Sequence, residues 1–314
     1  MAPGMRQIHP RIAHAAPFCS FTMLVVAKSK SPVALKRLAA DIMNKDSGVF
    51  EELVNSVRHY TIAFVSIPDS PNDHPWPSGT GTLVTINGSH YFLTAEHVWR
   101  ALKKLRSVGI TLVPEIDQCF TIPTSHLMAV GPRRPAAENQ GPDIVLLKIP
   151  EAKLGEIKAR KSFYPMEPVA QKPRVEGRCI EIAILLGAPG ESAKLLTPRN
   201  LDMTIHGIMA DHKAKKFTKG RYDYIDSKEF FGAHGFPKSY GGFSGGGLWH
   251  VHVYLDPKTS ERKERCRLAG MAFYEFPAKR KYRIIRCHGA RSIDAVRAML
   301  HPKTTKPSKL IMLS

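Results

Sequence analysis

Long apolar runs and closely spaced cysteines are both missing from this 314-residue chain. No apolar stretch approaches the roughly 20 residues that a helix needs to cross a bilayer, so the sequence predicts no transmembrane segment. Five cysteines are an odd number without close spacing, which argues against a disulfide framework and favours a reducing, cytoplasmic location. They are Cys19, Cys119, Cys179, Cys266 and Cys287.

Acidic residues are absent from the first 40 positions, which carry several Arg, Lys and His. That composition is typical of a transit peptide or of a basic arm. Alternatively, Met23 and not Met1 is the true start of the protein. The sequence leaves these three interpretations open. From Val33 to Val57 the apolar residues recur at helical spacing. We therefore expect an N-terminal basic and helical extension over residues 1–48.

The formal charge of +19 is concentrated near the C-terminus. From Lys258 to Ser314 there are 15 Lys and Arg against 4 Asp and Glu, and residues 302–314 form a basic tail. Such a face attracts nucleic acid, an acidic protein or an anionic surface, or only keeps the protein soluble. No base-stacking motif and no zinc-finger spacing accompanies the charge. The sequence does not indicate the oligomeric state of the protein.

After His59 the chain changes to short β-rich runs separated by turns, with Asn87-Gly88 as a strong hairpin signal. This spacing favours a barrel or a sandwich. A proline- and charge-rich connector, residues 150–173, separates two halves. A C-terminal helix over 292–300 is predicted, with Ser292 as its N-cap. The main predicted strands are His59–Ile67, Gly81–Ile86, Ser89–Thr94, Ile110–Val113, His126–Val130, Ile144–Ile149, Cys179–Leu186, Asp202–Met209, Gly246–Leu255, Leu268–Phe276 and Tyr282–His288.

One serine stands among five glycines in the stretch Gly241–Trp249, which reads Gly-Gly-Phe-Ser-Gly-Gly-Gly-Leu-Trp. Glycines allow the backbone to pack closely around a single hydroxyl. Ser244 is therefore the candidate nucleophile. The backbone N–H groups of Gly242 and Ser244 are the natural donors for an oxyanion hole.

A serine nucleophile needs a base and a group that orients the base. His97 follows an apolar strand in Thr-Ala-Glu-His-Val, and Asp143 opens another in Gly-Pro-Asp-Ile-Val-Leu-Leu-Lys. Taken singly, such a histidine is more often structural and such an aspartate is usually a turn residue. Together with Ser244 they occur in the order His, Asp, Ser, one of several orders that the triad takes on unrelated folds.

With these motifs the chain resembles trypsin-like serine proteases of the chymotrypsin fold, and bacterial HtrA-like enzymes in particular, from about His59 to Leu300. The resemblance also rests on Gly79-Thr80-Gly81-Thr82-Leu83-Val84 before the histidine, and on Leu268-Ala269-Gly270-Met271 after the serine. It implies an all-β fold of two six-stranded antiparallel β-barrels, at about 59–150 and 174–290, within a protease domain of residues 49–301. It also implies a serine endopeptidase that cleaves protein substrates with the triad His97, Asp143 and Ser244.

The chain departs from the family at several positions. Phe243 replaces the Asp or Asn that commonly precedes the nucleophile, and Val98 replaces a frequent cysteine after the histidine. We expect no peptide-binding PDZ domain. Lys238 falls where the pocket-floor residue of the family lies, which would favour acidic side chains. The residues expected to pair with substrate backbone are Phe273, Tyr274 and Glu275.

No cofactor is implied by the resemblance, and the sequence predicts no metal site. His250 and His252 share one face of a predicted strand, but no third ligand is evident nearby. The alternative to an enzyme is a catalytically silent protease-fold module. In that case the basic C-terminal region would bind an acidic partner or nucleic acid.

Overall fold

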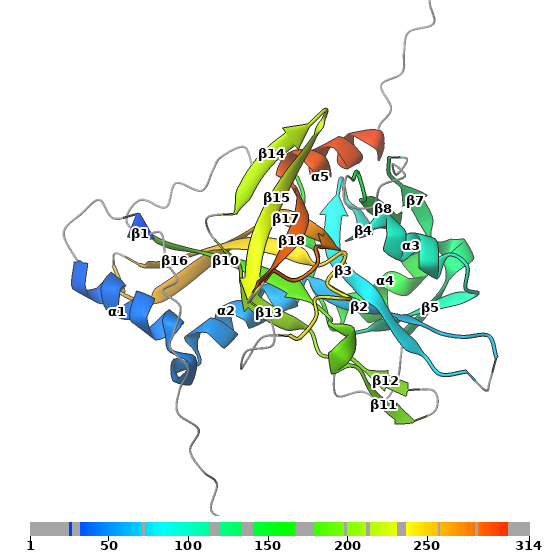
Figure 1. Ribbon diagram of the computed structural model, residues 1–314, viewed down its shortest axis with the longest axis horizontal. Coiled ribbons are helices and arrows are strands. Elements are labelled where there is room, and N and C mark those ends of the chain that lie inside the picture. The colour runs from blue at the N-terminus through cyan, green and yellow to red at the C-terminus, as the bar shows by residue number, and fades with distance from the viewer. Residues whose placement is uncertain are drawn as a thin grey trace, which may run out of the picture.

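The computed structural model describes residues 25–26, 32–70, 73–112, 120–132, 141–167, 179–197, 200–211, 214–230, 237–256, 258–279 and 282–300. β-Strands are the predominant secondary structure of this part of the chain, and they form two large sheets with a few helices beside them (Figure 1). The predicted start at Met23, most of the basic extension, Cys19, Cys119 and the tail 302–314 lie outside the described residues. Within the described residues, none of the helices combines the length and the apolar character that crossing a bilayer requires.

The first sheet is built from residues 61–165 and has the order β6-β5-β2-β3-β4-β8-β7, with β9 paired to β3. Asn87 and Gly88 both have positive φ, 48° and 75°, and close the predicted hairpin between β3 and β4. This is the backbone that a two-residue hairpin turn requires. The strands are β2 (Thr61–Ser66), β3 (Trp76–Ile86), β4 (Ser89–Thr94), β5 (Ser107–Thr111), β6 (Phe120–Pro123), β7 (Met128–Val130), β8 (Val145–Lys148) and β9 (Tyr164–Pro165).

The second sheet has the order β1-β10-β16-β17-β18-β15-β14, with β13 paired to β10. A separate two-stranded ribbon joins β11 to β12. The strands are β1 (Val25–Val26), β10 (Cys179–Gly187), β11 (Lys194–Thr197), β12 (Asn200–Asp202), β13 (His206–Met209), β14 (Lys215–Lys219), β15 (Tyr222–Phe230), β16 (Gly247–Leu255), β17 (Arg262–Glu275) and β18 (Tyr282–Gly289).

Helices lie beside the sheets (Figure 1). The first two are those expected from the helical spacing of the N-terminal region, and both contact β10. Leu35 and Leu53 are buried members of the main core, so this region packs against the second sheet. The helices are α1 (Pro32–Met43), α2 (Val49–Arg58), α3 (Glu96–Leu102), α4 (Leu154–Lys158) and α5 (Ala290–Arg297), with short 3-10 turns η1 (Lys45–Ser47), η2 (Thr124–His126), η4 (Glu151–Lys153), η5 (Gly190–Ser192) and η6 (Ala298–Leu300).

The predicted cap of the last helix was wrong. The helix begins at Ala290 after Gly289, and Ser292 is buried in its first turn. The carboxylate of Asp223 accepts the backbone N–H of Ser292 at 2.7 Å and that of Arg291 at 3.3 Å. A carboxylate from another strand therefore satisfies the N–H groups that a local cap would satisfy.

Strands β14 and β15 were not predicted, and neither were α4 and β9 inside the expected connector. In β15 polar and apolar residues are interleaved, and its partner β18 lies more than 50 residues further along the chain. Pairing with a distant strand stabilises this segment, and local propensity does not report such pairing.

An aromatic cluster joins the two sheets. Tyr60, next to β2, stacks on Trp249 of β16 with ring centroids 5.3 Å apart. Tyr164 of β9 meets Trp249 edge to face at 5.1 Å. Trp249 is fully buried. Since a buried aromatic pair adds about 0.5–1.5 kcal/mol beyond its area, this cluster fixes the first sheet against the second.

Candidate active site

Three loops at the ends of strands carry the predicted triad. His97 lies in the first turn of α3, directly after β4. Asp143 lies just before β8, after a cis Gly141–Pro142 peptide bond. Ser244 lies in the glycine-rich loop before β16. Two of the three residues therefore come from the first sheet and one from the second.

Asp143 is bonded twice to His97. Its Oδ2 lies 2.7 Å from Nδ1 of the imidazole, and its Oδ1 accepts the backbone N–H of His97 at 2.9 Å. The Asp143 side chain is fully buried, whereas 33% of the His97 side chain is exposed. A buried carboxylate at Nδ1 holds the proton on that nitrogen, so Nε2 is left as the free base. Part of the His97 ring is therefore open to solvent.

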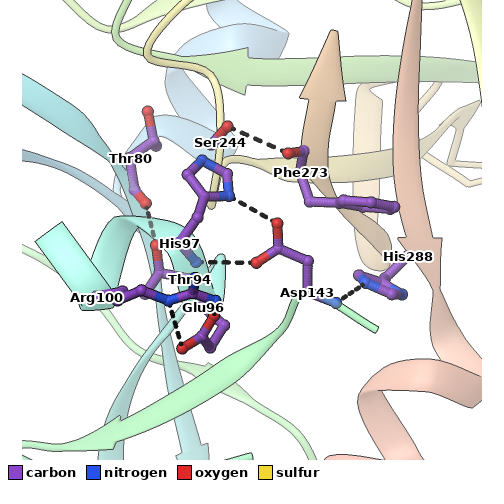
Figure 2. Close-up of polar contacts among 9 residues, drawn as sticks. All are labelled: Thr80, Thr94, Glu96, His97, Arg100, Asp143, Ser244, Phe273 and His288. Carbon is purple, nitrogen blue, oxygen red and sulfur yellow. Dashed lines mark hydrogen bonds and ion pairs between the residues drawn. The ribbon is translucent and has the colours of Figure 1, made fainter. Parts of the chain in front are cut away.

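Ser244 lies on the other side of the imidazole. Figure 2 shows the ring between Ser244 and Asp143, with the nitrogen that does not face Asp143 directed toward the serine. The Ser244 hydroxyl donates a hydrogen bond to the backbone oxygen of Phe273 at 3.5 Å. The backbone oxygen of Ser244 accepts the N–H of Thr80 at 2.8 Å. The serine loop is thus attached to β3, the strand that precedes the histidine strand.

Thr80 and Thr82 fasten the serine loop to the first sheet. The Thr80 hydroxyl donates to the backbone oxygen of Gly242 at 2.6 Å and accepts the N–H of Ala188 at 2.9 Å. The Thr82 hydroxyl donates to the backbone oxygen of Gly245 at 3.1 Å. Both threonines are fully buried. The threonines of the Gly-Thr-Gly-Thr stretch therefore position the loop that carries Ser244, a role that their sequence did not reveal.

Two backbone N–H groups in the serine loop are left without an acceptor among the described residues, those of Gly242 and Ser244. Their neighbours are all bonded: Phe243 donates to Tyr240, Gly245 to Ala272 and Gly246 to Phe243, at 2.7–2.9 Å. Gly242 has φ of 101°, and a Cβ there would lie 2.3 Å from the backbone oxygen of Ala188. Only glycine fits this position, and the turn leaves free the pair of donors predicted from the sequence.

The predicted substrate strand passes the serine at a bulge. The register between β17 and β18 shifts between Ala272 and Tyr274. Phe273 itself is buried, with its carbonyl oxygen toward Ser244. Tyr274 is partly buried. A bulge redirects backbone groups away from the ladder, so this segment presents its backbone beside Ser244.

The other two predicted substrate residues occupy different environments. Glu275 accepts the N–H of Tyr240 at 3.2 Å and pairs with Arg283 at 2.6 Å. Lys238 is exposed, and its backbone N–H donates to Glu191 at 2.6 Å. The structure therefore brings Glu275 against the start of the serine loop and leaves Lys238 at the surface.

His288 is a site residue that the sequence did not reveal. Its Nε2 accepts the backbone N–H of Asp143 at 2.9 Å, and its ring stacks on Phe273 at 4.3 Å (Figure 2). The residue is fully buried, and burial lowers its pKa to about 3. The imidazole is thus neutral at pH 7 and holds the aspartate loop in place. No local pattern marks it, because its role depends on β18 lying beside the Asp143 loop.

A further group of side chains lies outside the triad. Glu181, His250 and His252 bring their oxygen and nitrogen atoms within 4.8 Å of one another. The sequence had suggested the two histidines without a third ligand. The neighbouring strand β10 supplies that third group.

Comparisons with known proteins add little to this geometry. No protein-family model matches the chain, and no match is found among curated proteins. One solved structure that matches comes from work on Sesbania mosaic virus, described as showing that aromatic interactions drive the coupled folding and binding of the intrinsically disordered VPg protein. Its identity is 13%, it covers 77% of this chain and 91% of its own, and its TM-score is 0.38. Similarity at this level carries no argument about the function of this chain.

Proposed function

We propose that the chain is a serine endopeptidase with a chymotrypsin-like fold, in which each sheet curls into a six-stranded barrel with additional edge strands. The observation that carries the proposal is the order of groups in space. A buried carboxylate is bonded to Nδ1 of His97, and the opposite edge of the ring is turned toward Ser244. A triad uses this order of groups to activate a hydroxyl when the hydroxyl donates its proton to Nε2.

In the proposed reaction, Ser244 Oγ forms a bond to the carbonyl carbon of the substrate peptide while its proton passes to His97 Nε2. The charge that develops on the carbonyl oxygen is stabilised by the free N–H groups of Gly242 and Ser244. The carbon–nitrogen bond then breaks, and the leaving amine takes the proton from Nε2. Water repeats the sequence on the acyl-enzyme, which releases the second product and restores Ser244.

Asp143 keeps its charge throughout these steps. Its carboxylate holds the Nδ1 proton and stabilises the imidazolium that forms when Nε2 is protonated. The buried His288 fixes the aspartate backbone from behind. His97 is the group that accepts and returns the proton in each of these steps.

Substrate binding would use the backbone beside Phe273. An extended peptide that adds to this segment would place its scissile carbonyl between Ser244 and the two free N–H groups. A preference for acidic side chains would require the Lys238 ammonium to face the bound residue. A peptide-library cleavage profile that is the same in Lys238→Ala would remove Lys238 from the specificity site.

A fluorophosphonate tests the proposal directly, because it reacts with an activated serine hydroxyl. We expect the wild-type chain to be labelled once, Ser244→Ala to remain unlabelled, and His97→Ala to label far more slowly. Ser162→Ala, a change at an exposed serine of the first half, is the matched control and should label as the wild type does. Equal labelling of Ser244→Ala and wild type would exclude Ser244 as the nucleophile.

A second candidate function is binding of an acidic protein or a nucleic acid. It is favoured by the outer face of β17, where the exposed Lys263, Arg265 and Arg267 alternate. Such binding would weaken steeply with salt, since it depends on phosphate or carboxylate neutralisation. Binding of a labelled RNA oligonucleotide at 50 and 200 mM salt, compared with a triple Gln variant of these positions, would decide. An RNA affinity that changes neither with salt nor in the triple Gln variant would count against this binding function.

A further inference from the structure

The outer face of the second sheet carries three metal-ligand side chains on two adjacent strands. Glu181 of β10 stands directly opposite His252 of β16, and Ala183 stands opposite His250. Residues directly opposite in an antiparallel pair point to the same face. Because Ala183 is small, the carboxylate of Glu181 has room to reach diagonally across to His250.

The donor atoms converge on one small volume. Oε1 of Glu181 lies 2.7 Å from Nδ1 of His250, and Oε2 lies 3.6 Å from Nε2 of His252. All three ligand atoms lie within 4.8 Å of one another. A tetrahedral zinc ion with ligand distances of about 2.0–2.2 Å holds its ligands about 3.3–3.6 Å apart. Small side-chain rotations would bring the three groups to that spacing.

The chemistry of the donor atoms also fits a metal ion, because carboxylate oxygens and imidazole nitrogens are both zinc ligands. Two histidines and one glutamate form a ligand set that zinc uses in proteins.

The positive charge of Arg267, which contacts one of the ligands, opposes a cation. Nη2 of Arg267 lies 3.3 Å from Nδ1 of His250. That nitrogen cannot at once donate its proton to Glu181 and accept one from Arg267. A metal on Nδ1 would resolve this conflict, because the imidazole proton would move to Nε2 and the guanidinium would turn to the glutamate oxygen left outside the coordination.

We propose that Glu181, His250 and His252 form a binding site for a divalent transition metal of the zinc class, which links β10 to β16. The site has three protein ligands, and water completes the coordination. Its role is to fasten two strands of the second sheet, and it is independent of the proposed peptide hydrolysis.

The test uses the full chain without an affinity tag, Co²⁺ absorption as the readout and Zn²⁺ as the competitor. We expect one Co²⁺ per chain with the visible bands of a four-coordinate site, displacement by Zn²⁺, and a higher melting temperature with Zn²⁺. Glu181→Gln and His252→Ala should each weaken binding at least about tenfold. His59→Ala, a change at an exposed histidine near the first sheet, is the control and should bind as the wild type does.

A variant that removes the charge of Arg267 is expected to bind the metal more tightly, and a misfolded variant would not show this gain. Arg267→Met should strengthen Co²⁺ binding by about threefold or more, because a cation about 4–6 Å away no longer repels the metal. Unchanged affinity in both Glu181→Gln and His252→Ala, with melting temperatures near that of the wild type, would overturn the proposal. Failure of the wild-type chain to bind Co²⁺ or Zn²⁺ at about 100 μM would overturn it as well, since structural zinc sites bind far more tightly.

Discussion

Both carboxylate oxygens of Asp143 contact His97: Oδ2 contacts Nδ1 of the ring, and Oδ1 accepts the backbone N–H. This double contact determines what an amide would do in its place. In Asp143→Asn the amide oxygen stays on the backbone N–H, because an NH₂ group there would face a second donor. The NH₂ group then faces Nδ1, and the ring proton is forced onto Nε2.

We therefore expect Asp143→Asn to fold normally but to lose about 10³–10⁴-fold in peptide hydrolysis and in fluorophosphonate labelling rate. The loss would be measured as the rate of fluorophosphonate labelling at pH 7, from samples quenched at successive times. Partial recovery at high pH, where hydroxide can remove the misplaced proton, would support the tautomer explanation. A variant with more than about a tenth of the wild-type rate would contradict it.

Gly242 and Gly241 are neighbours with opposite tolerance to a methyl group. A Cβ on Gly242 would lie 2.3 Å from the backbone oxygen of Ala188 at φ of 101°, whereas one on Gly241 finds its nearest atom, Ser239 Oγ, at 3.4 Å. Gly242→Ala should cost at least about 1–2 kcal/mol in strain and remove labelling of Ser244. Gly241→Ala should keep both stability and labelling. Equal behaviour of the two variants would refute the assignment of Gly242 to the oxyanion hole.

Thr80 links the first sheet to the serine loop through one buried hydroxyl that both donates and accepts. Thr80→Val keeps the shape but leaves the N–H of Ala188 and the carbonyl of Gly242 unsatisfied. Buried groups without partners cost about 1–3 kcal/mol each, so urea unfolding should show a clear loss of stability. Thr80→Ser keeps the hydroxyl and should recover most of it. If Thr80→Val proved as stable as Thr80→Ser, the Thr80 hydroxyl would have no structural role.

His288 makes the stability of the protein sensitive to acid. Its pKa is lowered to about 3 by burial, while an unfolded histidine titrates near about 6.5. The unfolded state therefore binds a proton more readily, and this contribution to stability is present above pH 6.5 and is lost as pH falls toward 3. Between about pH 3 and 6.5, His288→Phe should reduce the slope of the free energy of unfolding against pH by up to about 1.4 kcal/mol per pH unit. It should also slow labelling, because the Asp143 loop loses an acceptor.

Glu229 acts in the opposite direction. Burial raises its pKa to about 8, although a hydrogen bond from Ser227 opposes the shift. The folded state holds the proton more firmly, so this contribution to stability is greatest below about pH 4.5 and is lost as pH rises to about 8. Glu229→Gln should be more stable than the wild type at pH 8 and show a flatter profile in urea unfolding from pH 5 to 8. Glu51→Gln, at an exposed carboxylate, should leave the profile unchanged.

The sequence alone predicted the features that depend on neighbouring residues. The mostly β class, the Asn87-Gly88 hairpin and the N-terminal helices follow from local propensity and apolar spacing. The glycine-rich serine loop also followed, because close backbone approach calls for residues without side chains. The sequence patterns singled out His97, Asp143 and Ser244, and the structure places the imidazole between the other two side chains.

Only the tertiary structure decided which distant groups meet. His288 reaches Asp143, Asp223 caps α5, Thr80 holds Gly242, and Glu181 completes the set begun by His250 and His252. In each case the partners lie on segments far apart in the chain. Their contact is fixed by how the sheets and loops pack, and for Glu181 by the register of β10 on β16. Register is set by how whole faces of a sheet pack against the core. Local sequence therefore specifies which residues have the chemistry, whereas the packing of the sheets specifies which of them act together.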